Sequence, residues 1–298
     1  MELVPAGPDV DNRAVLEHGN ILYFPPAPGG AGFPIPSAVL DALTGTTQDA
    51  RAIHKNIAYK PNKDAVSGLV DKSQTVATRD AMRDYSGRAL KFLATILPEY
   101  AAMWKVDYAS FRSIEERGRQ LPLTKRNDLL HVDAFPTRPV FGDLILRCFT
   151  NVSPSQKREW LTSDPFPLLA EREARNAGLE GYAAKSGSAV ESARRAAWRA
   201  LHAAGVPLVD RSPYDSFMLH FHDWMKANAD YQKNCPKYRF DLPPGSTWLV
   251  FTDVVPHAVL GGRLAMEQTV IVSRKSMKDP SLAPASILER MAGRNLTS

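Results

Sequence analysis

His131 and Asp133 lie two residues apart in the apolar stretch of residues 129–135. Alternate side chains of an extended strand point to the same face, so these two side chains can bind one metal ion while their apolar neighbours face the other way. A histidine and a carboxylate on one face are two thirds of the 2-His-1-carboxylate triad that holds Fe(II) in non-haem oxygenases. The H-x-D pattern alone is equally typical of a polar strand end with a solvated histidine.

A third metal ligand is found far downstream, in residues 246–260. This apolar run ends in a polar turn and then presents His257 next to Pro256. A ligand from a distant strand suits an antiparallel barrel or a double-stranded β-helix, in which inward faces converge on a central cavity. The sequence therefore predicts an Fe(II) site formed by His131, Asp133 and His257.

Other histidines offer weaker metal sites. His220 and His222 form an H-x-H pattern, but residues 216–229 are predicted to be helical, and residues two apart on a helix diverge by about 200°. The two rings would then not bind one ion together. His54 and His202 stand alone, and no G-x-S-x-G motif supports a serine hydrolase.

Arg147 lies inside the most apolar segment of the chain, residues 144–152. A buried guanidinium is costly unless it meets an anion. An iron oxygenase of this architecture needs a cation for the distal carboxylate of 2-oxoglutarate, and we predict that Arg147 is this cation, with Asn151 on the same face. The alternative is an outward-facing arginine at the barrel rim. Arg263 and Arg274, at the two ends of the last predicted strand, are competing candidates.

The composition is that of a globular protein: 44% of the 298 residues are hydrophobic and 23% are charged. The net charge of +5 favours anionic partners, but there is no dense basic run, so we expect no nucleic-acid binding. Cys148 and Cys235 are the two cysteines and form no C-x-x-C, which indicates neither a disulfide framework nor zinc. Without a signal peptide or a long apolar span, we expect a cytoplasmic protein, with peripheral contact to a membrane surface left open.

We expect an α+β fold with a mainly β core, a double-stranded β-helix of the jelly-roll or cupin type. The predicted elements include a strand at 19–24, helices at 37–43 and 79–100, strands at 144–152 and 264–273, and a short C-terminal helix. We expect residues 1–298 to form a single oxygenase domain. Its parts would be an N-terminal elaboration (1–105), the β-helix core (106–275) with a helical insertion at about 155–235, and a tail (276–298).

Five segments together resemble the 3-deoxy-D-manno-oct-2-ulosonic acid (Kdo) hydroxylase family. They are residues 54–59 (HKNIAY), 110–112 (SFR), 127–136 (NDLLHVDAFP), 146–151 (LRCFTN) and 252–257 (TDVVPH). The similarity extends over roughly residues 19–272. It implies an Fe(II)/2-oxoglutarate-dependent dioxygenase that uses O2 to hydroxylate C3 of Kdo in the lipopolysaccharide inner core (Kdo-lipid A) of Gram-negative bacteria. The family's metal positions fall on His131, Asp133 and His257.

The implied substrate is an anionic sugar beside phosphates, which requires cations at the cavity mouth. Arg126 and Arg138, five residues before His131 and after Asp133, are predicted to lie near the rim, and Lys55 and Arg112 are further candidates. Two alternatives remain open. One is a 2-oxoglutarate oxygenase that acts on another anionic small molecule or lipid, and the other is a non-catalytic β-helix protein that binds a sugar or lipid.

Overall fold

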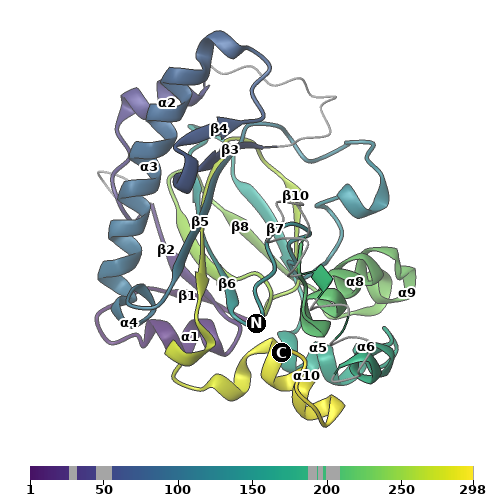
Figure 1. Ribbon diagram of the computed structural model, residues 1–298. Helices are drawn as coiled ribbons and strands as arrows, with labels where there is room; N and C mark the ends of the chain where they lie inside the picture. The colour runs from purple at the N-terminus through teal and green to yellow at the C-terminus, as the bar shows by residue number, and fades with distance from the viewer. Residues whose placement is uncertain (27–31, 45–55, 187–192, 194–196, 199–208, 298) are drawn as a thin grey trace.

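The computed structural model describes residues 1–26, 32–44, 56–186, 193, 197–198 and 209–297. In this part of the chain the strands form a large and a small sheet (Figure 1). The strands are β1 (Leu3–Pro5), β2 (Ile21–Phe24), β3 (Ile57–Lys60), β4 (Ala65–Ser67), β5 (Lys105–Arg112), β6 (Leu144–Asn151), β7 (Arg158–Thr162), β8 (Tyr238–Leu242), β9 (Thr247–Phe251), β10 (His257–Gly261) and β11 (Ala265–Val272).

The helices gather in two places, beside the large sheet and at the opposite end of the molecule around α8 (Figure 1). The α-helices are α1 (Asn12–Glu17), α2 (Ser37–Thr44), α3 (Thr75–Ile96), α4 (Pro98–Ala101), α5 (Phe166–Glu173), α6 (Leu179–Lys185), α8 (Pro213–Ala227), α9 (Ala229–Asn234) and α10 (Pro284–Ala292). Short 3-10 helices are η1 (Pro61–Lys63), η2 (Lys72–Gln74), η3 (Leu123–Lys125), η4 (Arg274–Ser276) and η5 (Pro280–Leu282). No helix in the described ranges is long and apolar enough to cross a membrane.

The large sheet has the order β1-β2-β9-β6-β11-β5-β3-β4, and its neighbouring strands are antiparallel except for the pair β1–β2. Strand β6 lies between β9 and β11, and each of its residues is buried. Arg147 on β6 is opposite Val250 and Thr269. The apolar run predicted at 144–152 therefore forms a central strand, as expected of a segment that is covered on both faces.

Helix α3 covers the outer face of the large sheet (Figure 1). It buries Met82, Tyr85, Ala89 and Leu93, which recur at helical spacing. The helix predicted from residue 79 begins four residues earlier and ends before Pro98, because a proline disfavours helical geometry in the residue that precedes it. The helix thus shields from solvent the side of the large sheet that faces away from the small sheet.

The small sheet has the order β10-β7-β8 and packs against the large one through aromatic rings. Trp160 on β7 lies edge-on to Phe149 and Trp248, with ring centroids 4.9 and 5.5 Å apart. The stretch predicted as a helical insertion at 155–235 therefore begins with a strand. The charged residues Arg158 and Glu159 made this strand hard to predict from the sequence. In the structure Arg158 and Trp160 are buried, and they alternate with half-buried neighbours.

The predicted α+β class is confirmed, and the predicted double-stranded β-helix is confirmed only as two facing sheets. Among the described residues no strand belongs to both sheets, so they do not close into a barrel. The segment around His131 forms only an isolated bridge with His257 instead of the predicted strand. The side-chain amide of Gln232 takes the place of a neighbouring strand, because it binds both the N–H and the carbonyl of Leu130, at 3.0 and 2.8 Å.

Candidate active site

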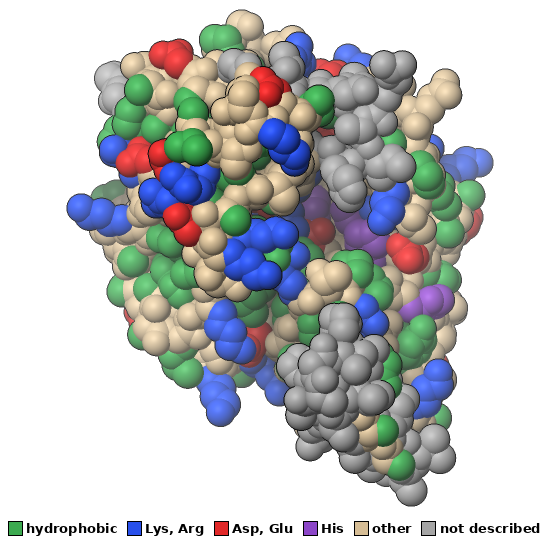
Figure 2. Space-filling model, turned by 45° about the horizontal axis from the view of Figure 1, so that its top comes forward, with side chains coloured by type: hydrophobic (Ala, Val, Ile, Leu, Met, Phe, Trp, Pro, Cys, Tyr) green, Lys and Arg blue, Asp and Glu red, His purple; other side chains and the backbone are tan. Residues whose placement is uncertain are grey.

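A cavity of about 800 Å³ lies between the two sheets and α8, and the predicted metal ligands line it. Figure 2 shows histidine side chains inside a hollow of the surface, with lysine and arginine side chains nearby. The walls come from β6, β7 and β10 and from α8, so residues far apart in the sequence meet here. A concave site with a few converging polar groups is the usual form of a ligand-binding site.

The backbone bridge between His131 and His257 holds the two imidazoles side by side. Each residue's N–H donates to the other's carbonyl, at 3.2 and 2.9 Å. The Nδ1 atoms of the two rings bond to the carbonyls of Leu129 and Val255, at 2.7 and 3.0 Å. The Nε2 atoms then carry the lone pairs, and they lie 3.9 Å from Oδ1 and Oδ2 of Asp133. Backbone bonds of this kind fix the tautomer in metal sites.

The ionisation states match those of metal ligands. Burial holds the pKa of His131 well below its usual value and also lowers that of His257, so both imidazoles are neutral near pH 7. Burial acts to raise the pKa of Asp133, but the charge of Arg147 opposes it most strongly, and this carboxyl stays ionised. Oδ2 of Asp133 is buried and lies 3.1 Å from Nε of Arg147, in an ion pair without hydrogen-bond geometry. The three side chains therefore fit a divalent metal ion.

A further histidine, His222 on α8, belongs to this cluster. Possible ligand atoms of His131, Asp133 and His222 all lie within 4.8 Å of one another, and the His222 ring meets His131 edge-on at 4.7 Å. Its Nδ1 bonds to the carbonyl of Val132 at 2.7 Å. His220 points elsewhere and packs on Tyr182, so the predicted divergence of the two rings is confirmed. The sequence argument discounted His222 together with His220 and so missed its place in the cluster.

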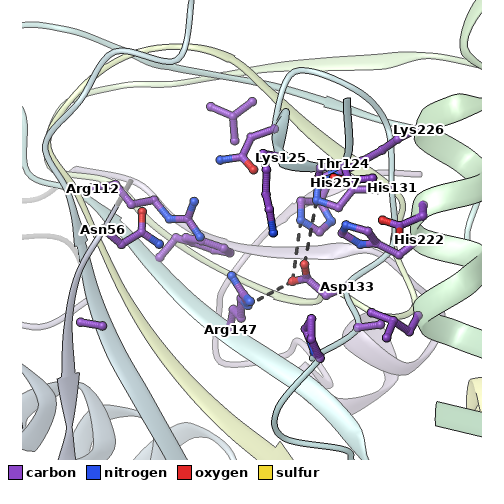
Figure 3. Close-up of a pocket in the computed structure, with 18 of the residues that line it drawn as sticks. Asn56, Arg112, Thr124, Lys125, His131, Asp133, Arg147, His222, Lys226 and His257 are labelled. Atoms are coloured by element: carbon purple, nitrogen blue, oxygen red, sulfur yellow. Dashed lines mark hydrogen bonds and ion pairs between the residues drawn. The ribbon is translucent and has the colours of Figure 1, made fainter. Parts of the chain in front are cut away.

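Arg147 lies in the cavity as predicted, but its guanidinium is already paired. Nε is 3.1 Å from Oδ2 of Asp133 (Figure 3). Nη1 is 2.9 Å from Oε1 of Glu267. Arg112, also a lining residue, binds the other oxygen of Glu267 at 2.7 Å. Two arginines and two carboxylates thus form one buried chain of ion pairs beside the three histidines.

Arg158 on β7 also lines the cavity, and sequence reasoning missed it because its segment was expected to be helical. Its side chain is 1% exposed and donates to the carbonyl of Gly262. It forms no ion pair with a carboxylate of the described residues. Burial lowers the pKa of Arg158 to about 10, so it remains a cation at neutral pH. Two residues further on, Trp160 stacks on His257 with centroids 5.3 Å apart.

Asn151 is not among the residues that line this cavity, and its predicted role in cosubstrate binding stays a prediction. Its fully buried amide donates to the carbonyls of Gln156 and Leu242, at 2.8 and 3.0 Å, and so joins loops at the end of β6. Arg263 donates to a backbone carbonyl, and Arg274 pairs with Glu289. Neither competing arginine lines the cavity.

Two of the cations predicted near the rim, Arg126 and Arg138, form ion pairs with carboxylates that do not line the cavity. Arg138 pairs with Asp107 at 2.9 Å, and Arg126 forms a two-armed pair with Asp128. Neither is among the residues that line the cavity. Lys55 lies outside the described residues. A substrate role for these three residues stays a prediction.

Comparisons with known proteins identify one family. The model of the 3-deoxy-D-manno-oct-2-ulosonic acid (Kdo) hydroxylase family matches residues 5–295. Among solved structures, the Kdo hydroxylase KdoO, a non-haem Fe(II) α-ketoglutarate-dependent dioxygenase, in complex with α-ketoglutarate and Fe(III), is 31% identical. That match has a TM-score of 0.79 and covers 98% of this chain and 93% of that chain.

The apo structure of the same hydroxylase matches at 31% identity with a TM-score of 0.80, over 99% of this chain and 94% of that chain. Its complex with succinate and Fe(III) gives the same values. A search of curated proteins found no match. Because the family model spans nearly the whole sequence, the chain belongs to the Kdo hydroxylase family.

Proposed function

We propose that this protein is an Fe(II)- and 2-oxoglutarate-dependent dioxygenase that hydroxylates C3 of Kdo in the lipopolysaccharide inner core. One observation carries the proposal: the side chains of His131, Asp133 and His257 meet in a cavity that also contains buried arginines. Both histidines are neutral and the aspartate is ionised, as metal binding requires. The solved relative is a Kdo hydroxylase that binds iron and α-ketoglutarate, which is another name for 2-oxoglutarate. In Kdo, a 3-deoxy sugar acid, C3 is the ring position that lacks a hydroxyl.

We assign the metal to His131, Asp133 and His257. The mutual backbone bonds of the two histidines fix their separation, and Asp133 reaches both Nε2 atoms, at 3.9 Å. His222 lies on α8, and one hydrogen bond from its ring, to the carbonyl of Val132, fixes its position. We assign it to the open side of the site, where substrate would enter. A facial arrangement of three ligands leaves the remaining positions for cosubstrate and oxygen.

We propose that Arg158, in place of Arg147, binds the distal carboxylate of 2-oxoglutarate. Asp133 and Glu267 already neutralise the charge of Arg147, whereas Arg158 has only a backbone acceptor. A dianion that arrives beside Arg158 would supply the missing counter-charge and could accept two parallel hydrogen bonds. Arg147 would instead hold Asp133 in its binding orientation, as residues behind a metal ligand commonly do.

When bound, iron with 2-oxoglutarate supplies the oxidation: O2 and 2-oxoglutarate are consumed, succinate and carbon dioxide form, and one oxygen atom enters the sugar C–H bond. The residues of this chain provide the binding and the shielding. Neutral His131 and His257 and ionised Asp133 offer lone pairs to the metal. Trp160, which is buried and stacked on His257, excludes water from one side of the site.

The wider setting is also part of the proposal. We propose that residues 1–298 form a single oxygenase domain whose two facing sheets correspond to a double-stranded β-helix. The substrate would be Kdo-lipid A at the cytoplasmic face of the inner membrane, reached by peripheral contact. Arg112 lines the cavity, and Arg126 and Arg138 remain candidates for rim contacts with phosphates. The net charge of +5 would favour such an anionic surface.

One assay separates this function from its alternatives. Purified protein with Fe(II), 2-oxoglutarate and O2 should form succinate much faster when Kdo-lipid A is added. An oxygenase for another anionic molecule would form succinate without responding to Kdo-lipid A. A binding protein without catalysis would form none, and either result would reject the proposal.

A further inference from the structure

Lys226 on α8 is a buried lysine in the wall of the active-site cavity. It is 4% exposed and lines the cavity one helical turn after His222, so the two side chains share the face of α8 that meets the metal ligands. Figure 3 shows Lys226 and His222 entering from this helix, across the site from Arg112 and Arg147. Nothing in the metal or cosubstrate assignment uses it.

The described residues leave the charge of Lys226 largely unneutralised. Its Nζ donates to the backbone carbonyl of Thr124 at 3.2 Å and forms no ion pair with any described carboxylate. Asp223, one turn earlier on α8, lines the same cavity without pairing with it. A buried ammonium with one neutral acceptor is costly, and the cost falls when an anion binds beside it.

The other buried cations of the cavity are accounted for. Arg112 and Arg147 share Glu267, Arg147 also binds Asp133, and Arg158 is assigned to the cosubstrate. Lys226 approaches from the helical side, beside the open side of the metal site. The partner that Lys226 lacks is therefore an anion on the sugar substrate, since 2-oxoglutarate is assigned to Arg158.

The chemistry of the substrate supplies such an anion at the right place. Kdo is an ulosonic acid: its carboxylate, C1, is bonded to C2, and C2 is bonded to C3. A C3 held for hydroxylation thus brings the carboxylate within two bonds of the reacting carbon, so its cation must lie beside the metal and not at the outer rim. Lys226 meets this condition, whereas Arg126 and Arg138 do not line the cavity.

We propose that the ammonium of Lys226 binds the C1 carboxylate of the substrate sugar and so orients C3 toward the group formed by His131, Asp133 and His257. This inference rests on the proposed function and names the residue that recognises the acid. Lys226 is then a specificity-determining residue, which separates a sugar acid from neutral sugars of the same shape. A point charge on a flexible stem can follow the carboxylate as the sugar settles in the cavity.

The test compares a Kdo methyl glycoside with its C1 carboxamide, which has nearly the same shape and no charge. Binding is measured without oxygen to enzyme loaded with Co(II) and 2-oxoglutarate, and kcat/KM is measured with Fe(II). The wild type should prefer the acid by about tenfold to a hundredfold, the usual effect of a charge-assisted hydrogen bond. Lys226→Met should abolish this preference, and Lys226→Arg should retain part of it.

Lys233→Met on α9 is the matched control, because Lys233 is an exposed lysine outside the cavity, and it should keep the wild-type preference. The preference of Lys226→Met for the acid is measured with Co(II) bound at full occupancy, because full occupancy shows that the site has folded. An unchanged preference for the acid in Lys226→Met would overturn the inference. Lys125 also lines the cavity, and loss of the preference in Lys125→Met but not in Lys226→Met would overturn it as well. These outcomes leave the proposed function intact, whereas a wild type that turns over neither glycoside nor Kdo-lipid A would reject both.

Discussion

The guanidinium of Arg147 lies 3.1 Å from Oδ2 of Asp133, and both side chains are almost completely buried. An arginine predicted to hold the cosubstrate is thus bound to a proposed metal ligand. The pair explains how a carboxyl in a buried site stays ionised, because burial alone would raise its pKa. The same pair leaves Arg147 poorly suited to a second carboxylate.

Arg147→Met should weaken metal binding by about tenfold to a hundredfold, the usual effect of losing a residue that orients a metal ligand. The loss should grow as the pH falls, because the pKa of Asp133 rises without the arginine and protons then compete with the metal. Co(II) titrations followed by absorbance at several pH values measure this. Unchanged metal affinity with a raised KM for 2-oxoglutarate would restore Arg147 as the residue that binds the cosubstrate.

Arg158→Met should raise the KM for 2-oxoglutarate by about tenfold or more, because the distal carboxylate loses charge-assisted hydrogen bonds. Affinity for Co(II) should change much less, since Arg158 does not touch a metal ligand. The control is Arg239→Met, an exposed arginine of the same small sheet that pairs with Glu159. Equal KM values in both variants would show that another residue binds the cosubstrate.

Alanine substitutions test which histidines hold the metal. His131→Ala, Asp133→Ala and His257→Ala should each lose stoichiometric Co(II) binding, because three ligands on one face are needed. His222→Ala should retain it, as should His220→Ala, the control on the other side of α8. If His222→Ala loses the metal while His257→Ala keeps it, the third ligand is His222.

The pH profile should carry the signature of Lys226. Burial lowers the pKa of Lys226 to about 8, against the opposing charges of Asp133 and Asp223. The amine is charged below that pH and neutral above it, so kcat/KM for the Kdo methyl glycoside should fall as the pH rises through about 8. In Lys226→Arg the fall should move to higher pH, because a guanidinium stays protonated. An identical profile in both proteins would count against this assignment.

The sequence allowed prediction of the parts of the site that local patterns encode. The alternation around His131 and Asp133 was sufficient to predict that both face one cavity, and Leu130 and Val132 are buried on the other side. The apolar run of β6 and the helical spacing in α3 predicted a strand and a packed amphipathic helix, and both are present. These features depend on residues close together in the chain.

The parts that were missed depend on pairing between distant segments. The charged residues of β7 suggested a helix, and only its pairing with β8 and β10 makes it a strand and turns Arg158 inward. The neutralisation of Arg147 depends on Glu267, which the last strand brings beside it. His222 and Lys226 are spaced by four on a helix, a signal for one shared face that could have been used.

The most direct test of the central claim is the product formed from Kdo-lipid A. The purified protein is incubated with Fe(II), 2-oxoglutarate and isotopically labelled O2, and the sugar is analysed by mass spectrometry and NMR. The proposed function predicts a gain of one labelled oxygen atom at C3 of Kdo, with one succinate formed for each hydroxyl. Kdo-lipid A recovered without added oxygen, from protein that binds iron fully, would contradict it.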